Sequence, residues 1–172
     1  QSLEDIALMR VLPNVTVIVP CDYEEAKKAV HEIVEHNKPV YMRFDRSKVP
    51  VITTNDSPFK IGKAEILWDS SNPVVTIIAI GYLVHNALLC AKELEKEGIQ
   101  ILVVNNHTIK PMDEELILGV AKRTGAIVTV EDHQIAGGMG SAVAEFLAKT
   151  YPVPIEFVGV DNKFGQSGTP VE

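Results

Sequence analysis

The apolar positions of the first fifty residues predict a helix, a strand, a second helix and a second strand. β-branched residues fill positions 15–19, as expected of a strand that is covered on both faces. In positions 26–34 apolar residues recur at three- and four-residue spacing, which indicates one buried stripe of a helix. Asp22 precedes that helix as a candidate cap, and another apolar run follows at positions 40–44. A strand, a helix and a strand in this order predict a parallel sheet.

The pattern changes at residues 45–58, where polar residues and two prolines interrupt the apolar periodicity. We therefore predict three parts of the chain: the end of a first domain over residues 1–50, a linker over 51–58 and a second domain over 59–172.

The second domain reads as β-β-α-β-α-β-α-β. The short polar turn at 69–73 predicts that its first two strands pair antiparallel, and right-handed crossovers place helices on both faces of the sheet. The predicted fold class is α/β: a partial parallel-sheet domain followed by a doubly wound, mostly parallel sheet with one antiparallel edge strand. The expected strands cover 59–68, 74–80, 99–104, 126–130 and 154–160, and the expected helices cover 83–97, 113–124 and 138–150.

The charge balance and the lengths of the apolar runs exclude some partners. There are 16 Lys and Arg residues against 23 Asp and Glu residues, for a net charge of −7, whereas a nucleic-acid binder normally carries a basic patch. The longest apolar run, at 74–84, is shorter than the roughly 20 residues that span a bilayer. No signal-peptide pattern is visible, and Cys21 and Cys90 are too few for a disulfide framework. We expect a cytoplasmic protein with no nucleic-acid or membrane partner.

Arg43 and Arg46 lie at the end of the strand predicted at 40–44. Ligands of open parallel sheets gather at the carboxyl ends of the strands, and a guanidinium there can hold a phosphate or carboxylate through two parallel hydrogen bonds. We treat both arginines as candidate substrate-binding residues. The alternative is that they pair with Asp45 or with other nearby acids.

Glu131, Asp132 and His133 follow the apolar strand predicted at 126–130. We predict that these three residues form an interface or cap a loop, and a ligand site at this edge of the sheet is the alternative. The glycine-rich turn at 137–140 opens a helix, where a phosphate could bind. The dinucleotide pattern would need a further glycine at Val143, and close packing also explains such a turn.

Several short segments resemble the transketolase family. They are SLEDIALMR (2–10), LPN (12–14), VPCD (19–22), PVYMRFDR (39–46), TIKPMD (108–113), VEDH (130–133), GGMG (137–140) and FGQSGTP (164–170). The first four resemble the end of the pyrimidine-binding domain and the others resemble the C-terminal domain. Deoxyxylulose-phosphate synthase and the β subunits of 2-oxoacid dehydrogenases share this architecture and are the near alternatives, and a non-catalytic dimerisation module is a further one.

The resemblance implies a transferase that uses thiamine diphosphate and a divalent metal ion to move a two-carbon ketol unit between phosphorylated sugars. Arg46 aligns with the arginine that holds the substrate phosphate in this family, and Arg43 is its weaker neighbour. The family binds its cofactor between domains of two subunits, so a homo-oligomer or a complementary N-terminal subunit is implied.

The resemblance also implies that most of the active site lies outside this chain. In the family, the glutamate that activates the cofactor and the residues that contact the sugar precede the position of Gln1, and the chain continues beyond Glu172. We therefore expect a fragment that has no catalytic, cofactor-binding or metal-binding residues of its own, that binds no cofactor alone and that is inactive by itself.

Overall fold

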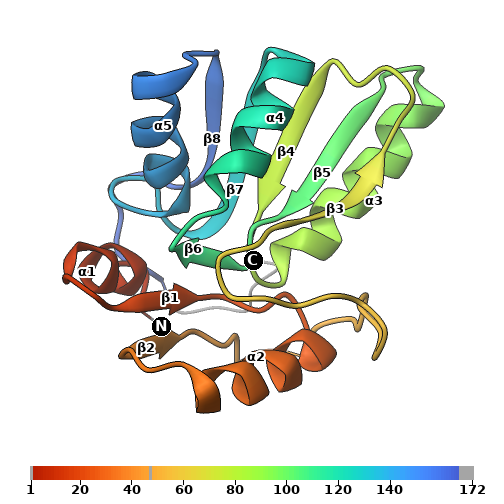
Figure 1. Ribbon diagram of the computed structural model, residues 1–172. Helices are drawn as coiled ribbons and strands as arrows, with labels where there is room; N and C mark the ends of the chain where they lie inside the picture. The colour runs from red at the N-terminus through yellow and green to blue at the C-terminus, as the bar shows by residue number, and fades with distance from the viewer. Residues whose placement is uncertain (1, 47, 167–172) are drawn as a thin grey trace.

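The computed structural model describes residues 2–46 and 48–166, which form two sheets with helices packed around them (Figure 1). The end of the closing segment 164–170 lies outside the described residues from position 167 onward. The helices are α1 (Asp5–Val11), α2 (Tyr23–Glu35), α3 (Leu83–Lys96), α4 (Glu114–Thr124) and α5 (Met139–Thr150).

The described chain contains every strand that the apolar pattern predicts, and it also contains β6, which the pattern does not predict. The strands are β1 (Thr16–Ile18), β2 (Val40–Met42), β3 (Glu65–Asp69), β4 (Val75–Ala79), β5 (Ile101–Asn105), β6 (Thr108–Lys110), β7 (Ile127–Gln134) and β8 (Ile155–Val160).

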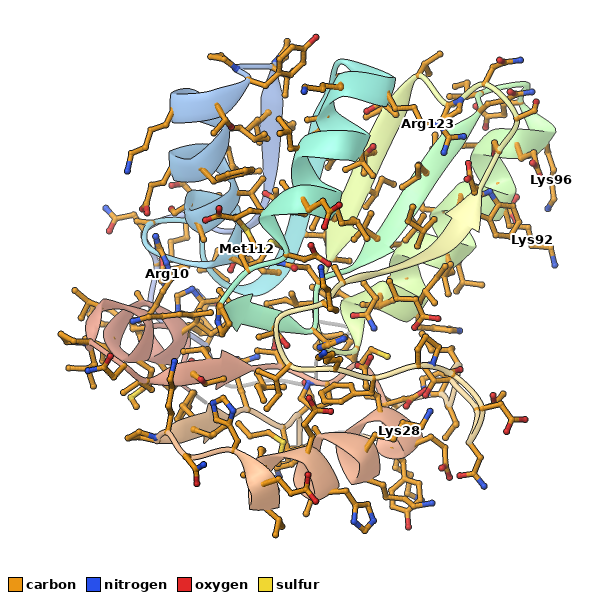
Figure 2. All side chains as sticks on the ribbon, in the orientation of Figure 1. Arg10, Lys28, Lys92, Lys96, Met112 and Arg123 are labelled. Atoms are coloured by element: carbon orange, nitrogen blue, oxygen red, sulfur yellow. The ribbon has the colours of Figure 1, made fainter. Side chains whose placement is uncertain are left out.

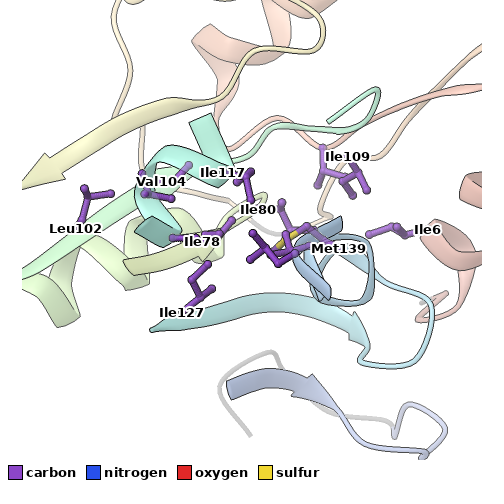
Figure 3. Packing of buried hydrophobic residues seen from close by; sticks show 14 of the residues in the cluster. Ile6, Ile78, Ile80, Leu102, Val104, Ile109, Ile117, Ile127 and Met139 are labelled. Carbon is purple, nitrogen blue, oxygen red and sulfur yellow. The ribbon is translucent and has the colours of Figure 1, made fainter. Parts of the chain in front are cut away.

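The larger sheet has the strand order β3-β5-β4-β7-β8. Strands β5, β4, β7 and β8 are parallel, and β3 is antiparallel to β5 at the edge. Successive side chains of β4 face opposite sides of the sheet. Ile77 packs in the cluster that contains residues of α3. Ile78, and Ile80 directly after the strand, pack with residues of α4 and α5 on the other side (Figure 3). Helices therefore cover both faces, and the predicted doubly wound, mostly parallel sheet is confirmed.

The partner of the edge strand differs from our prediction. The turn at 69–73 was expected to pair β3 with β4, but β3 pairs with β5. Both ends of the turn are bonded to the start of β5: the Ser70 N–H donates to the Ile101 carbonyl at 3.2 Å and the Val74 N–H donates to the Gln100 carbonyl at 2.9 Å. Since β4 already has parallel neighbours on both sides, the chain crosses the start of β5 instead of forming a hairpin.

The smaller sheet combines segments that are far apart in the sequence. Strands β1 and β2 are parallel, as predicted, and β6 adds to the other side of β1 in the antiparallel direction. Val17 and Ile109, from β1 and β6, belong to the same buried cluster as Ile78 of the larger sheet. The two sheets therefore share one hydrophobic core, and Figure 1 shows β6 between β1 and the larger sheet. We call residues 2–46 the first unit and residues 59–166 the second unit.

Strand β7 is longer than predicted. The expected strand ends at residue 130, but β7 continues to Gln134, so Glu131, Asp132 and His133 lie within the strand. Burial alternates along it, and Glu131 and His133 are buried on one side.

The predicted linker, residues 51–58, is held against α2. Asp22 caps α2 as predicted, and its other carboxylate oxygen accepts hydrogen bonds from the N–H groups of Ile52 and Thr53 at 2.7 and 2.6 Å. Lys28 donates from α2 to the carbonyl of Ser57 at 2.6 Å (Figure 2). Backbone groups of residues 52, 53 and 57 thus form hydrogen bonds with side chains of Asp22 and Lys28.

Candidate functional site

The carboxyl edge of the larger sheet is packed against the smaller sheet. The Val19 N–H, just after β1, donates to the carbonyl of His107, just after β5, at 2.8 Å. A Cβ atom on Gly81, just after β4, would lie 3.2 Å from a side-chain carbon of Val19. Part of the edge where ligands bind in open α/β sheets is therefore occupied by the first unit of the same chain.

Arg43 lies where the two units meet, at the end of β2. Its N–H continues the parallel ladder by donating to the Ile18 carbonyl at 2.9 Å. Its side chain donates from Nε to Asp5 Oδ2 at 3.0 Å and from Nη1 to Asp132 Oδ1 at 2.7 Å. One guanidinium thus joins β2, α1 and β7, which are far apart in the sequence.

The remaining contacts of this guanidinium also lie within the chain. Nη2 donates to the carbonyls of Ser2 and Asp132 at 3.3 and 3.2 Å, and the Tyr41 hydroxyl donates to Asp5 Oδ2 at 2.7 Å. We call Asp5, Tyr41, Arg43 and Asp132 the Arg43 cluster. Since most of the donors of Arg43 already have acceptors in the chain, its predicted substrate contact stays a prediction.

The electrostatics of the Arg43 cluster follow from its burial. Removal from water raises the pKa of Asp132, and the attraction of Arg43 opposes that rise. Burial, together with the hydrogen bond to Asp5, raises the pKa of Tyr41 to about 12, so the hydroxyl remains a donor at neutral pH. One cation therefore lies between two carboxylates at a half-buried junction.

Arg46 follows Arg43 by three residues in the sequence, and its side chain is exposed. It is on the segment that follows β2, and Phe44, Asp45 and Val49 of this segment line a cavity of about 540 Å³. Arg46 thus follows the strand end predicted from the sequence and lies on a segment that borders a cavity, although its own side chain is not among those that line it. Its contact with a substrate phosphate stays a prediction.

The cavity lies between α2, the segment after β2 and the ends of β1, β4 and β7. Its polar lining includes Lys27, His31, Arg43 and Asp132, while much of the remaining wall is apolar. A mostly apolar cleft with a few charged groups is the usual form of a small-molecule site.

The side chain of Glu131 binds the N-terminus of α5. Its carboxylate accepts hydrogen bonds from the N–H groups of Met139 and Gly140 at 2.7 and 2.9 Å. Burial raises its pKa to about 7 even though these two donors favour the charged form. A Cβ atom on Gly138 would lie 2.2 Å from the Glu131 carboxylate, which explains the glycine there. The N–H groups that a phosphate would need are therefore used by Glu131.

His133 is fully buried and connects β7 to α1. Its Nδ1 lies 2.7 Å from the carbonyl of Gln134, which can only accept, so Nδ1 carries the hydrogen. Its Nε2 accepts a hydrogen bond from the Ala7 N–H at 3.3 Å. These two partners define one neutral tautomer of the ring.

Each member of the predicted triplet thus bonds to a different element of the same chain. Glu131 bonds to α5, Asp132 to Arg43 and His133 to α1. A role of the triplet at an interface between subunits stays a prediction.

Sequence reasoning missed the residues that complete this junction. Lys110 donates to the carbonyls of Arg10 and Leu12 at 2.9 and 2.6 Å and so satisfies the end of α1. Arg10 donates to the carbonyl of Gly137 at 3.0 Å, and Figure 2 shows Arg10 between α1 and the second unit. Lys110 is separated from Leu12 by 98 residues, a spacing that no local pattern reveals.

The described residues were compared with the requirements of a metal site and of a membrane-spanning helix. Within residues 2–46 and 48–166, no group of three His, Cys, Asp or Glu side chains could hold a metal ion. Among the helices in that same part of the chain, none is long and apolar enough to cross a bilayer.

Comparison with protein families matches nearly the whole chain. Residues 62–172 match the family model described as the transketolase C-terminal domain, and residues 1–51 match the transketolase pyrimidine binding domain. The chain belongs to the transketolase family. The predicted resemblance is thereby confirmed in both parts of the chain.

The relatives include proteins named as transketolase subunits, transketolases and synthases. The chain is 43% identical over 167 residues to the 6-deoxy-6-sulfo-D-fructose transketolase subunit SqwH of Clostridium sp. strain MSTE9, covering 97% of this chain and 51% of that protein. It is 38% identical over 173 residues to human transketolase, covering 99% of this chain and 27% of the human protein. A 1-deoxy-D-xylulose-5-phosphate synthase of Crocosphaera subtropica is also 38% identical, over 177 residues, covering 100% of this chain and 28% of that protein.

Solved transketolase structures have the same fold. A protein described as a split gene transketolase, inactive β4 tetramer, superimposes with a TM-score of 0.92 at 45% identity, covering 96% of this chain and 55% of that one. The transketolase of Campylobacter jejuni has the same fold, with a TM-score of 0.76 at 24% identity, covering 98% of this chain and 25% of that one. The chain spans about half the length of the first relatives that it matches.

Proposed function

We propose that this chain is the C-terminal part of a thiamine diphosphate-dependent transketolase that transfers a two-carbon ketol unit between phosphorylated sugars. The observation that carries the proposal is the match to both the pyrimidine-binding and the C-terminal domain models. Similarity to two proteins named as transketolase subunits, at 43% and 39% identity, supports it. The cytoplasmic location expected from the sequence remains part of the proposal.

Two observations support the expectation that this chain does not by itself hold the diphosphate of the cofactor or its metal ion. Glu131 already uses the N–H groups at the start of α5, and no described cluster of three His, Cys, Asp or Glu side chains could hold a metal ion. We infer that thiamine diphosphate, which supplies the electron sink of this chemistry, is held by residues outside this chain. No step through the cofactor is assigned to the residues described above.

Arg46 is the residue that we propose for substrate binding. Its exposure, its place after β2 and its neighbours in the cavity lining support a contact with the phosphate of a sugar. A guanidinium can form two parallel hydrogen bonds to such a group.

A complementary N-terminal subunit, or a homo-oligomer, completes the proposed enzyme. Large apolar side chains of the first unit are exposed, including Val11 on α1 and Val34 on α2, with exposed fractions of 75% and 81%. Val34 belongs to the stripe that was predicted to be buried. We propose that these uncovered apolar side chains contact a further part of the enzyme. Because the resemblance implies that the catalytic residues lie outside this chain, the isolated chain is expected to be inactive.

The test is Arg46→Ala in the complete enzyme, formed by this chain and its complementary part. Loss of a charge-assisted hydrogen bond costs about 1.5–3 kcal/mol, so the KM for phosphorylated sugars should rise by at least about tenfold. The matched control is Arg123→Ala, which removes an exposed arginine paired with Asp69 on the larger sheet. An unchanged KM in the Arg46 variant would contradict the phosphate role.

A second candidate function is supported by the synthase relative. Its identity to this chain equals that of human transketolase, at 38%. Formation of 1-deoxy-D-xylulose 5-phosphate by the complete enzyme, without ketol transfer between sugars, would favour this second candidate. If the chain were a non-catalytic dimerisation module, neither 1-deoxy-D-xylulose 5-phosphate nor a product of ketol transfer would form.

A further inference from the structure

The segment that carries Arg46 is held at both of its ends. At the first end, Arg43 bonds through its backbone to Ile18 and through its side chain to Asp5 and Asp132. At the second end, the N–H groups of residues 52 and 53 donate to the carboxylate of Asp22. Holding both ends of a loop reduces the number of conformations that it can adopt.

We propose that Asp132 is a positioning residue for Arg46 and that it acts through Arg43. The second unit would thereby set the geometry of Arg46, the proposed phosphate-binding residue of the first unit. This inference rests on the proposed role of Arg46 in substrate binding.

The contact between the two units is specific in its geometry. Asp132 accepts from two different nitrogens of Arg43, from Nη1 at its carboxylate (2.7 Å) and from Nη2 at its backbone carbonyl (3.2 Å). The two side chains are only 13% and 18% exposed. Replacing Asp132 by a neutral residue leaves this guanidinium partly desolvated with one compensating charge fewer, and we expect it to shift towards its remaining carboxylate partner, Asp5.

Such a movement would be transmitted along a short path. Arg46 follows Arg43 by three residues, and Phe44 and Asp45 between them line the cavity together with Arg43 and Asp132. A displacement of about 1 Å in a positioning group can lower turnover by about two orders of magnitude. Loss of the Asp132 carboxylate charge should therefore weaken phosphate recognition, although Asp132 is not proposed to touch the substrate.

The experiment is Asp132→Asn in the complete enzyme, assayed with a phosphorylated sugar and with its dephosphorylated counterpart. The KM for the phosphorylated sugar should rise by about tenfold, because a displaced Arg46 loses a charge-assisted hydrogen bond, and the inhibition constant of inorganic phosphate should rise by a similar factor. The KM for the dephosphorylated sugar should stay within about twofold, because a general loss of structure would affect both substrates. Asp132→Glu, which keeps the charge, should restore part of the difference.

Three further variants make the result specific. Asp5→Asn removes the other carboxylate partner of Arg43 and should produce the same selective rise in KM. Asp69→Asn removes the partner of Arg123 from an exposed ion pair elsewhere and should leave both KM values unchanged. Asp132→Asn combined with Arg46→Ala should be no worse than Arg46→Ala alone, because both act on one contact.

The outcomes separate this inference from the proposed function. If Arg46→Ala raises the KM for the phosphorylated sugar and Asp132→Asn does not, the positioning role is overturned and the role of Arg46 stands. If Asp132→Asn raises the KM for both substrates equally, its role is structural and the positioning proposal is likewise overturned. If Arg46→Ala itself has no effect, the proposed phosphate site fails, and the positioning proposal fails with it.

Discussion

Glu25 is a buried carboxylic acid that joins α2 to the larger sheet. One of its oxygens accepts from the Cys21 N–H at 2.6 Å, and the other accepts from Nδ2 of Asn105, the last residue of β5, at 2.7 Å. Burial raises the pKa of Glu25 to about 7, although these hydrogen bonds favour the charged form. Ionisation of this group is therefore harder in the folded chain than in the unfolded chain.

This difference in pKa predicts how the stability of the protein depends on pH. The contribution of Glu25 to stability is largest below its ordinary pKa of 4.5 and is lost as the pH rises through about 7. Between pH 5 and pH 8 the free energy of unfolding should fall by about 2–3 kcal/mol through this group. Urea unfolding of Glu25→Gln should show a correspondingly smaller decline.

The control for this measurement is Glu97→Gln, a change at an exposed position after α3. It should keep the pH dependence of the unmodified protein. Equal slopes for Glu25→Gln and the unmodified protein would contradict the coupling of Glu25 to folding.

At the scale of the elements, two helical glycines have opposite surroundings. A Cβ atom on Gly140, in the first turn of α5, would lie 2.5 Å from Thr129 Oγ1 and 2.8 Å from a ring carbon of Phe157. A Cβ atom on Gly119, in α4, would meet nothing within 4 Å. The first glycine permits α5 to pack closely on the sheet, whereas the second has no such function.

We expect Gly140→Ala to lower the free energy of unfolding by about 1–3 kcal/mol, because the added methyl group overfills the contact between α5 and β7. Gly119→Ala should raise it by about 0.5–1 kcal/mol, because alanine restricts the unfolded chain and favours the helix. Midpoints of urea unfolding would measure both effects. A stabilising Gly140→Ala change would show that α5 is not closely packed there.

At the scale of the whole molecule, the regions that match two family models share a sheet and a core. β6 belongs to the region matched by the C-terminal model, yet it pairs with β1 of the pyrimidine-binding region. Lys110, His133 and Asp132 add hydrogen bonds between the two regions. The interface is thus continuous with the hydrophobic core, which favours cooperative folding.

We therefore expect the two regions to stay together after the chain between them is cut. A protease site inserted between Asn55 and Asp56, in an exposed turn, should allow complete cleavage, and both pieces should then coelute in gel filtration. The same insertion without protease is the control. Separate elution of the pieces would contradict a shared core.

The order and type of the main elements could be predicted from the sequence because they depend on local periodicity. The apolar spacing in residues 26–34 and the β-branched run at 15–19 each reflect the repeat of one element. The capping role of Asp22 follows from neighbouring backbone groups. The positions of Arg43 and Arg46 after a parallel strand follow in the same way, since both are local to the chain.

The partners of these elements and side chains were decided only by the tertiary structure. β3 pairs with β5 rather than β4, and Arg43 binds Asp5 and Asp132, which are 38 and 89 residues away. Glu131 was recognised as a functional candidate, but its role at the start of α5 depends on how that helix folds back on β7. Local periodicity does not predict such contacts, because they form only when burial of the shared core brings distant segments together.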